Sequence, residues 1–491
     1  MRRMRARLRG FVHASLHLAV PLAVLASTSL ARAQSPAAGA RMPPPPSAPV
    51  AAVPRSVPSF ALDVERVVLD NGLEILLEEN HRSPLVALQV AYKAGAKHDP
   101  KNRRGLAYLV GLLVADPSTR HVGRTVAAEM YRALKAEAFR PSVDTNVERT
   151  TVSYTFPSNQ LELALWTESD RMGFGLDGMD LATILQKRDR IDAARRAEDE
   201  RPYGALDGIV RQAMFPGDHP YRAGVLGSGG DLASVTHADV KAFVKTHYAP
   251  NNATLVLVGD FDKTKVKELL KRYFGPIVRG PAVAKVDAPP VTFDGERHVP
   301  VVANVERPRL LVSWSTPPLF ADGDLELDVT YQVLTGTAEG RLKRRLLDLK
   351  LATEVTSRQR SSALASHFDV DVTLAPGVTH DRVLRVVDEE LDKLRAAAPT
   401  EAEVDVARQR LLRQTAFPAE TFAGRAQLIG YYHHYSGDAA KLVNEYLARY
   451  AAVTPEAVRK AVSTHLPPKK RIVLTVTHSS SAPRGGKAEG N

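Results

Sequence analysis

Two segments of the chain match each other without a gap at a constant offset of 218 residues. The first reads THADVKAFVKTHYAPNNATLVLV over 236–258, and the second reads TPEAVRKAVSTHLPPKKRIVLTV over 454–476. The identical pairs are Thr236/Thr454, Val240/Val458, Val244/Val462, Thr246/Thr464, His247/His465, Pro250/Pro468 and Val258/Val476. In each copy a threonine is placed to cap a helix, valines form its inner face, a proline ends it and an apolar strand follows. This ordered match indicates two copies of one folding unit.

The pattern of the remaining sequence predicts that this unit is α+β. The predicted strands of the first copy are Val64–Leu69, Leu73–Leu77, Val86–Tyr92 and Thr151–Phe156, and the turn Asp70-Asn71-Gly72 joins the first two as a hairpin. The predicted helices, from apolar residues at helical spacing, cover 103–116, 124–137, 161–172 and 180–199. We expect an N-terminal half (61–278) and a C-terminal half (299–478), joined by a linker rich in proline and glycine over 279–298.

The two ends of the chain differ in composition from these halves. Residues 1–33 predict a signal peptide, with a basic start, an apolar stretch over Phe11–Leu30 and the cleavage motif Ala31-Arg32-Ala33. An uncleaved membrane anchor is the alternative, because about 20 apolar residues can span a bilayer. Residues 34–60 predict a Pro/Ala-rich disordered tether, and 479–491 a disordered tail. We expect a periplasmic or secreted protein with no membrane span after signal cleavage.

Composition excludes several classes of chemistry. The chain has no cysteine, which excludes disulfides, thiolate zinc sites, iron–sulfur clusters and a cysteine nucleophile. Six arginines and no acids lie in the first 33 residues, so the rest of the chain carries only about +5 of the net charge of +11. Basic and acidic residues alternate along the predicted helices and aromatics are sparse, so we expect no nucleic-acid partner. The glycine-rich stretch Gly224–Gly230 lacks the Lys-Ser/Thr of a phosphate-binding loop.

Five segments of the chain resemble, in order and spacing, the pitrilysin/insulinase family of inverted-zincin metallopeptidases, in the branch of the mitochondrial processing peptidase. The segments are LDNGLEILLEE (Leu69–Glu79), AYKAGAKHDPKNRRGLAYLVGLLV (Ala91–Val114), DTNVERTTVSYTFP (Asp144–Pro157), FPGDHPYRAGVLGSGGDL (Phe215–Leu232) and THYAPNNATLVLVGDFD (Thr246–Asp262). The resemblance implies two tandem homologous α/β halves forming a clamshell around an extended peptide. It also implies that only the N-terminal half of an active member holds zinc.

The zinc motif of that family, H-x-x-E-H on a helix, is degenerate in this sequence. Two histidines four residues apart share a helix face and hold the metal, while the glutamate activates water. Alignment of the resemblance places Tyr108 at the first histidine, Gly111 at the catalytic glutamate and Leu112 at the second histidine. We therefore expect no catalytic or metal-binding residue at these positions.

The third zinc ligand of the family, a glutamate on a later helix, aligns with Ala194. The interval from Leu112 is a few residues longer than is usual in the family, so Asp189 and Glu198 are alternative equivalents. Neither carboxylate restores a site whose first three positions are tyrosine, glycine and leucine.

The substrate-holding arginine and tyrosine, which active members carry in the C-terminal half, are also replaced. In the stretch Arg341–Thr353 the resemblance places Leu347 at the arginine and Thr353 at the tyrosine. Arg344 lies one helical turn before Leu347 and is a candidate substitute, whereas Arg345 points elsewhere. The alternative is that both arginines belong to a solvated basic face.

Three other groups of histidines and neighbouring residues are candidates for a replacement site. Adjacent His433 and His434 project about 100° apart on a helix, which disfavours joint ligation of a metal. The segment His367–Val372 alternates, so one histidine and two aspartates share a strand face; we expect its apolar residues in the core and its polar residues in solvent. We expect His219, in His219-Pro220-Tyr221, to pack in a turn.

The family scaffold is retained while its zinc-ligand positions are replaced, and this combination favours one functional hypothesis over two others. The first is a catalytically inactive family member that acts as the non-catalytic partner subunit of a zinc-bearing paralogue. The second is a stand-alone peptide-binding or scaffold protein, because a strand edge can hold an extended peptide without cutting it. The third is an active zinc metalloendopeptidase with unusual ligands. We expect no cofactor in this chain, zinc being the metal of active relatives.

Overall fold

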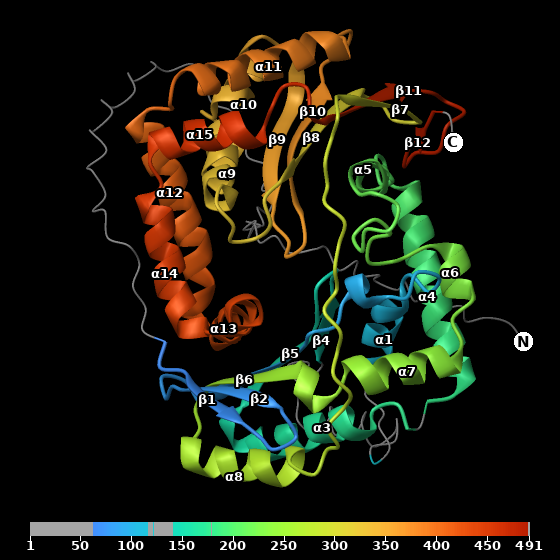
Figure 1. Ribbon diagram of the computed structural model, residues 1–491, viewed down its shortest axis with the longest axis vertical. Helices are drawn as coiled ribbons and strands as arrows, with labels where there is room; N and C mark the ends of the chain where they lie inside the picture. The colour runs from blue at the N-terminus through green and yellow to red at the C-terminus, as the bar shows by residue number, and fades with distance from the viewer. Residues whose placement is uncertain (1–61, 116–120, 122–140, 178, 490–491) are drawn as a thin grey trace, which may run out of the picture.

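The computed structural model describes residues 62–115, 121, 141–177 and 179–489, and its strands form two six-stranded sheets (Figure 1). The first sheet contains β1 (Glu65–Val68), β2 (Glu74–Glu79), β3 (Leu85–Tyr92), β4 (Ser142–Thr145), β5 (Thr150–Pro157) and β6 (Ala253–Gly259). The second contains β7 (Arg297–Ala303), β8 (Arg309–Thr316), β9 (Ala352–Arg360), β10 (Ser366–Leu374), β11 (Ile472–His478) and β12 (Lys487–Ala488). The predicted hairpin and the two further strands of the N-terminal half are confirmed as β1–β2, β3 and β5.

The two sheets share one topology, which confirms the duplication. The strand orders are β1-β2-β6-β3-β5-β4 and β12-β7-β11-β8-β10-β9. In both, the second and third strands in this order run parallel, and every other neighbouring pair is antiparallel. The mixed α+β fold with two homologous halves is therefore the fold expected from the sequence.

Helices repeat in the same way. The repeated sequence forms α7 (His237–His247) with β6 and α15 (Pro455–His465) with β11, and Thr236 and Thr454 cap the two helices as predicted. The offset of 218 also relates Gly105 to Gly323, which precede α1 (Leu106–Val114) and α9 (Asp324–Tyr331) with φ of 95° and 96°. Glycine is the residue that adopts this left-handed conformation without strain. Helix α1 is thus the structural counterpart of α9.

Further helices pack on the sheets or on one another. Those of the N-terminal half are α3 (Leu161–Phe174), α4 (Leu181–Glu200), α6 (Gly229–Ala233) and α8 (Lys263–Phe274). Those of the C-terminal half are α10 (Arg341–Asp348), α11 (His380–Ala396), α12 (Glu401–Ala416) and α14 (Ala439–Ala452). The shorter helical segments are η1 (Ala96–His98), η3 (Ser158–Gln160), η4 (Pro250–Asn252), η5 (Gln332–Gly336) and η6 (Phe417–Glu420). Each half has its own buried apolar core between sheet and helices.

The two halves also exchange one helix each, which the sequence did not predict. Helix α5 (Leu206–Met214) of the N-terminal half packs against the C-terminal sheet, and α13 (Phe422–Ser436) of the C-terminal half packs against the N-terminal sheet (Figure 1). A buried ion pair between Arg425 on α13 and Glu78 on β2 crosses the second contact, with 3.0 Å between Arg425 Nε and Glu78 Oε2. Each sheet is therefore completed by a helix from the other half.

The ends of the halves differ in part from expectation. Residues after Gly275 run as an extended connection to β7, with Phe293 buried in the contact between halves (Figure 1). The tail after His478, expected to be disordered, is ordered through Glu489 because its backbone bonds to both halves. The predicted signal peptide, the tether and the helix at 124–137 lie outside the described residues. Among the helices that the structure describes, none has the length and apolar character needed to cross a membrane.

Candidate functional site

The helix that aligns with the zinc-binding helix of the family is α1, and a buried carboxylate anchors its start. Asp99, which is 6% exposed, accepts hydrogen bonds from the backbone N–H groups of Gly105 and Ala107, each at 2.7 Å. Burial raises the pKa of Asp99 to about 7, against the opposing effect of these two bonds. The helix itself is almost wholly apolar and packs on α4, α7 and β4. Its position is thus fixed from several sides.

Tyr108 and Leu112, at the two histidine positions, belong to the packing of this core. Both side chains are partly buried against the N-terminal apolar cluster. Burial raises the pKa of the Tyr108 hydroxyl; the positive charge of Arg190 opposes this shift and the charge of Asp144 adds to it. A neutral phenol beside a leucine offers zinc no ligand set that fits it, because zinc binds imidazole, thiolate and carboxylate groups.

Gly111, at the glutamate position, is closed off by β4. A Cβ atom on this glycine would lie 2.2 Å from Thr145 Oγ1 and 3.4 Å from Thr145 Cβ. The Thr145 hydroxyl is held by Thr150 Oγ1 at 3.1 Å, and the Thr150 hydroxyl in turn donates to Ala94 O at 3.0 Å. The space that a glutamate side chain would need is therefore occupied by a hydrogen-bonded threonine pair.

Helix α4 brings no replacement carboxylate to α1. Ala194 and the alternative Asp189 are both exposed, and Glu198 forms an ion pair with Arg201 at 2.7 Å. The α4 residues buried in the core shared with α1 are Ile184 and Ile191. Across the part of the chain that the structure describes, no group of three or more histidine, aspartate or glutamate side chains is arranged to hold a metal ion. The residues present do not fit zinc at this position.

The two positions aligned with the substrate-holding residues lie on the C-terminal half, at α10 and β9. Leu347 is 37% exposed, and the Thr353 hydroxyl donates to Thr373 O at 3.4 Å. The candidate substitute Arg344 is exposed and pairs with Glu339 at 3.2 Å. It therefore belongs to the surface of α10.

For β10, the strand with alternating polar residues, one of the two expectations is confirmed and the other is wrong. Its apolar residues lie in the C-terminal core; these are Phe368, Val370 and Val372. Its polar face is not solvated: Asp369 is 6% exposed and accepts from Arg360 Nε at 2.8 Å, while burial lowers the pKa of His367. The cause is the exchanged helix α5, whose Asp207 lies 3.7 Å from Arg360. The cluster is an internal charge network between the halves.

The adjacent residues His433 and His434 point into different surroundings, as the helix geometry predicted. His433 lies 3.3 Å from Glu74 of β2, whereas His434 faces Lys93, Lys97 and Arg149. Burial, and then these positive charges, lower the pKa of His434 to about 3.

His219 is packed in its turn, as expected. It is 1% exposed, stacks on Phe215 with ring centroids 4.5 Å apart, and accepts from Tyr221 N–H at 3.1 Å. Burial lowers its pKa to about 4, so the ring is neutral at ordinary pH.

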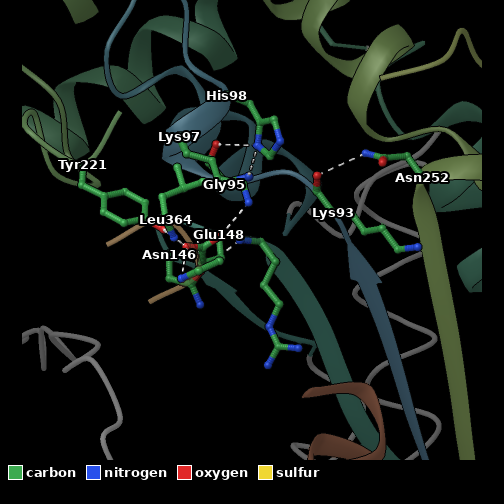
Figure 2. A network of polar contacts seen from close by, with 11 residues as sticks. Lys93, Gly95, Lys97, His98, Asn146, Glu148, Tyr221, Asn252 and Leu364 are labelled. Atoms are coloured by element: carbon green, nitrogen blue, oxygen red, sulfur yellow. Dashed lines mark hydrogen bonds and ion pairs between the residues drawn. The ribbon is translucent and has the colours of Figure 1, made fainter. Parts of the chain in front are cut away.

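A polar network at the junction of the halves was missed by the sequence reasoning (Figure 2). Glu148 accepts from Lys97 Nζ at 2.6 Å, from the Tyr221 hydroxyl, and from the backbone N–H of Ala363 at 3.1 Å. The Tyr221 hydroxyl in turn accepts from Leu364 N–H at 2.9 Å. Ala363 and Leu364 lie at the tip of the β9–β10 hairpin, in the C-terminal half.

The sequence feature that could have pointed to this network is the family resemblance. Glu148 lies in the segment DTNVERTTVSYTFP, and Tyr221 lies in FPGDHPYRAGVLGSGGDL. Two of the segments that carry the resemblance thus supply the contact between the halves.

Comparisons with known proteins agree with this fold. The family model described as "Peptidase M16 inactive domain" matches residues 234–411. The zinc protease PqqE of Helicobacter pylori is 22% identical over 346 residues, which cover 70% of this chain and 77% of that protein. The non-peptidase homolog YmxG of the same species is 22% identical over 366 residues, covering 72% of this chain and 79% of that protein.

Solved structures show the same architecture over most of the chain. A protease from Helicobacter pylori superposes with a TM-score of 0.76 at 20% identity, covering 85% of this chain and 100% of that one. The first half of the periplasmic protease PqqL from Escherichia coli gives a TM-score of 0.68 at 16% identity, covering 87% of this chain and 95% of that one. The chain is therefore a homologue of the pitrilysin/insulinase-like metallopeptidases of the M16 family, with the zinc motif of that family degenerate.

Proposed function

We propose that the protein is an exported, catalytically inactive member of this family, and that it acts as the non-catalytic partner subunit of a zinc-bearing paralogue. The observation that carries the proposal is the contact between Gly111 and Thr145, where a Cβ would lie 2.2 Å from the threonine hydroxyl. The position that a catalytic glutamate would need is filled by side-chain packing. Loss of the ligands and closure of their space together favour a role other than peptide hydrolysis.

Two further observations support the non-catalytic part of this proposal. The positions aligned with the substrate-holding residues, Leu347 and Thr353, carry no charged or phenolic group. A relative of similar length in Helicobacter pylori is named a non-peptidase homolog. Export is supported by the basic and apolar pattern of residues 1–33 and by a structural relative that is named a periplasmic protease.

The retained scaffold supports the partner role. The chain keeps both halves, the duplicated topology and the network of Glu148 and Tyr221 that joins them. A clamshell whose metal half is inactive can still supply walls and strand edges to a second chain that carries the metal. An extended peptide is the ligand that such walls fit.

The test is to add the purified full chain to a zinc-bearing paralogue from the same organism and to measure peptide hydrolysis and co-purification. The proposal predicts a stable complex and a changed rate for the paralogue, with no hydrolysis by this chain alone. A chain that stays monomeric and leaves the paralogue's rate unchanged contradicts the partner role. Calorimetric binding of an unfolded peptide by that same monomer would favour the stand-alone peptide-binding alternative.

A further inference from the structure

We propose that residues 479–489 form an interdomain latch that holds the two halves in their closed arrangement. This segment follows β11 and has the composition of a flexible tail, with three serines, a proline and two adjacent glycines. It nevertheless lies at the junction of the halves and makes backbone hydrogen bonds to both of them within three consecutive residues, Pro483–Gly485. The inference is independent of the proposed function.

The first set of latch contacts is with the C-terminal half. Ser479 N–H donates to Ala303 O at 2.9 Å, and Asn304 N–H donates to Pro483 O at 3.1 Å. The strand β12 then pairs antiparallel with β7, and Glu489 N–H donates to Pro300 O at 2.9 Å. The latch thereby becomes the edge strand of the C-terminal sheet, in the place that β1 takes in the N-terminal sheet.

The second set of contacts is with the N-terminal half, at the turn between α4 and α5. Tyr203 N–H donates to Arg484 O, and Ala205 N–H donates to Gly485 O, each at 3.0 Å. The approach is close: a Cβ on Gly485 would lie 2.1 Å from Asp199 O near the end of α4. Only glycine fits at this position without moving the helix or the latch.

The turn to which the latch is hydrogen-bonded also contacts the C-terminal half directly. Tyr203 has a φ of 62°, a left-handed conformation that bulky L-residues adopt only when their surroundings enforce it. Its hydroxyl donates to Arg307 O at 2.7 Å, and the Arg309 guanidinium lies 4.6 Å from the centre of its ring. The strained backbone at Tyr203 therefore depends on contacts that exist only while the halves are together.

Beneath the latch lies the exchanged helix α5. The next glycine, Gly486, is buried and faces Leu206 of α5 and Val301 and Ala303 of β7, which would be 3.1–3.7 Å from an added Cβ. The latch thus closes over the first turn of the helix that the N-terminal half inserts against the C-terminal sheet. Loss of the latch removes this apolar contact with Leu206, which weakens the packing of α5 on the C-terminal sheet and lets the halves separate.

The absence of native cysteine makes the separation of the halves directly measurable. Cysteines introduced as Glu268→Cys on α8 and Arg385→Cys on α11 are on exposed positions of opposite halves and can carry spin labels. Pulsed electron paramagnetic resonance then gives the distance distribution between the halves. The latch predicts one narrow distribution for the full chain and an added population at longer distance after deletion of residues 482–491.

A milder variant and a rescue distinguish a latch from general destabilisation. Gly485→Val should broaden the distribution, whereas the control Gly295→Ala, which has no atom within 4 Å of its added Cβ, should leave it unchanged. A synthetic peptide of residues 479–491, added in excess to the deletion variant, should restore the short distance, and a scrambled peptide should not. A deletion variant or Gly485→Val variant with intact far-UV circular dichroism and the distance distribution of the full chain would overturn the proposal.

Discussion

The packing of Gly111 against Thr145 makes the substitution Gly111→Ala a sharp test of the closed site. In an exposed helix interior, replacing glycine by alanine stabilises a protein by about 1 kcal/mol. At Gly111 the new methyl group would lie 2.2 Å from Thr145 Oγ1, so either α1 moves from β4 or the threonine side chain rotates. Overpacking of this kind costs about 1–3 kcal/mol, and loss of the Thr145–Thr150 hydrogen bond adds about 1 kcal/mol. We expect a net destabilisation of about 1–3 kcal/mol.

A control glycine and a substitution of Thr145 test whether the contact with Thr145 causes this destabilisation. Gly173→Ala on α3 places its methyl 3.6 Å from the nearest atom, on Ile277, and should stabilise the protein or leave it unchanged. Thr145→Ala removes the obstructing oxygen, so the double variant with Gly111→Ala should be more stable than the sum of the single effects by at least about 1 kcal/mol. Urea unfolding followed by circular dichroism measures the stability of these four variants and of the unsubstituted protein. A Gly111→Ala protein as stable as Gly173→Ala, or strictly additive effects, would refute the reasoning.

Three further predictions follow from buried charges and from the absent ligands. Burial raises the pKa of Asp328 to about 8. The free energy of unfolding should therefore fall as pH rises from about 4 to 8, by at most about 1.4 kcal/mol per pH unit. Asp328→Asn should remove this pH dependence in thermal unfolding scans. Arg425→Met strands the buried Glu78 carboxylate and should cost about 3–5 kcal/mol in urea unfolding, whereas adding Glu78→Leu should recover stability; no recovery would contradict a buried pair. Chelator should leave the melting temperature unchanged, and a fall of several degrees would reveal a structural metal.

Much of the fold follows from local patterns in the sequence. The constant offset between the segments at Thr236 and Thr454 predicted the duplicated topology, and the Asp70-Asn71-Gly72 turn predicted the first hairpin. These features are local, because capping, turn formation and strand alternation depend on residues close together in the chain. The degenerate zinc positions rest on the family resemblance, which places three of them on the short segment Tyr108–Leu112.

The contacts between the halves were not predictable in the same way. Periodicity shows that α5 and α13 each have an apolar face, but it does not show which sheet covers that face. The polar face of β10 was for the same reason expected in solvent, although α5 buries it. The ordered tail depends on backbone hydrogen bonds at Pro483–Gly485, which composition does not encode. The closure of Gly111 by Thr145 is a contact between a helix and a strand 34 residues further on.

The proposed inactive role requires that this scaffold has lost its metal chemistry. The most direct measurement is the zinc content of the purified full chain after dialysis, by mass spectrometry, paired with cleavage of a fluorogenic peptide library with and without chelator. We expect zinc far below one atom per chain and no cleavage that the chelator abolishes. One tightly held zinc per chain, whose removal stops peptide hydrolysis, would contradict it.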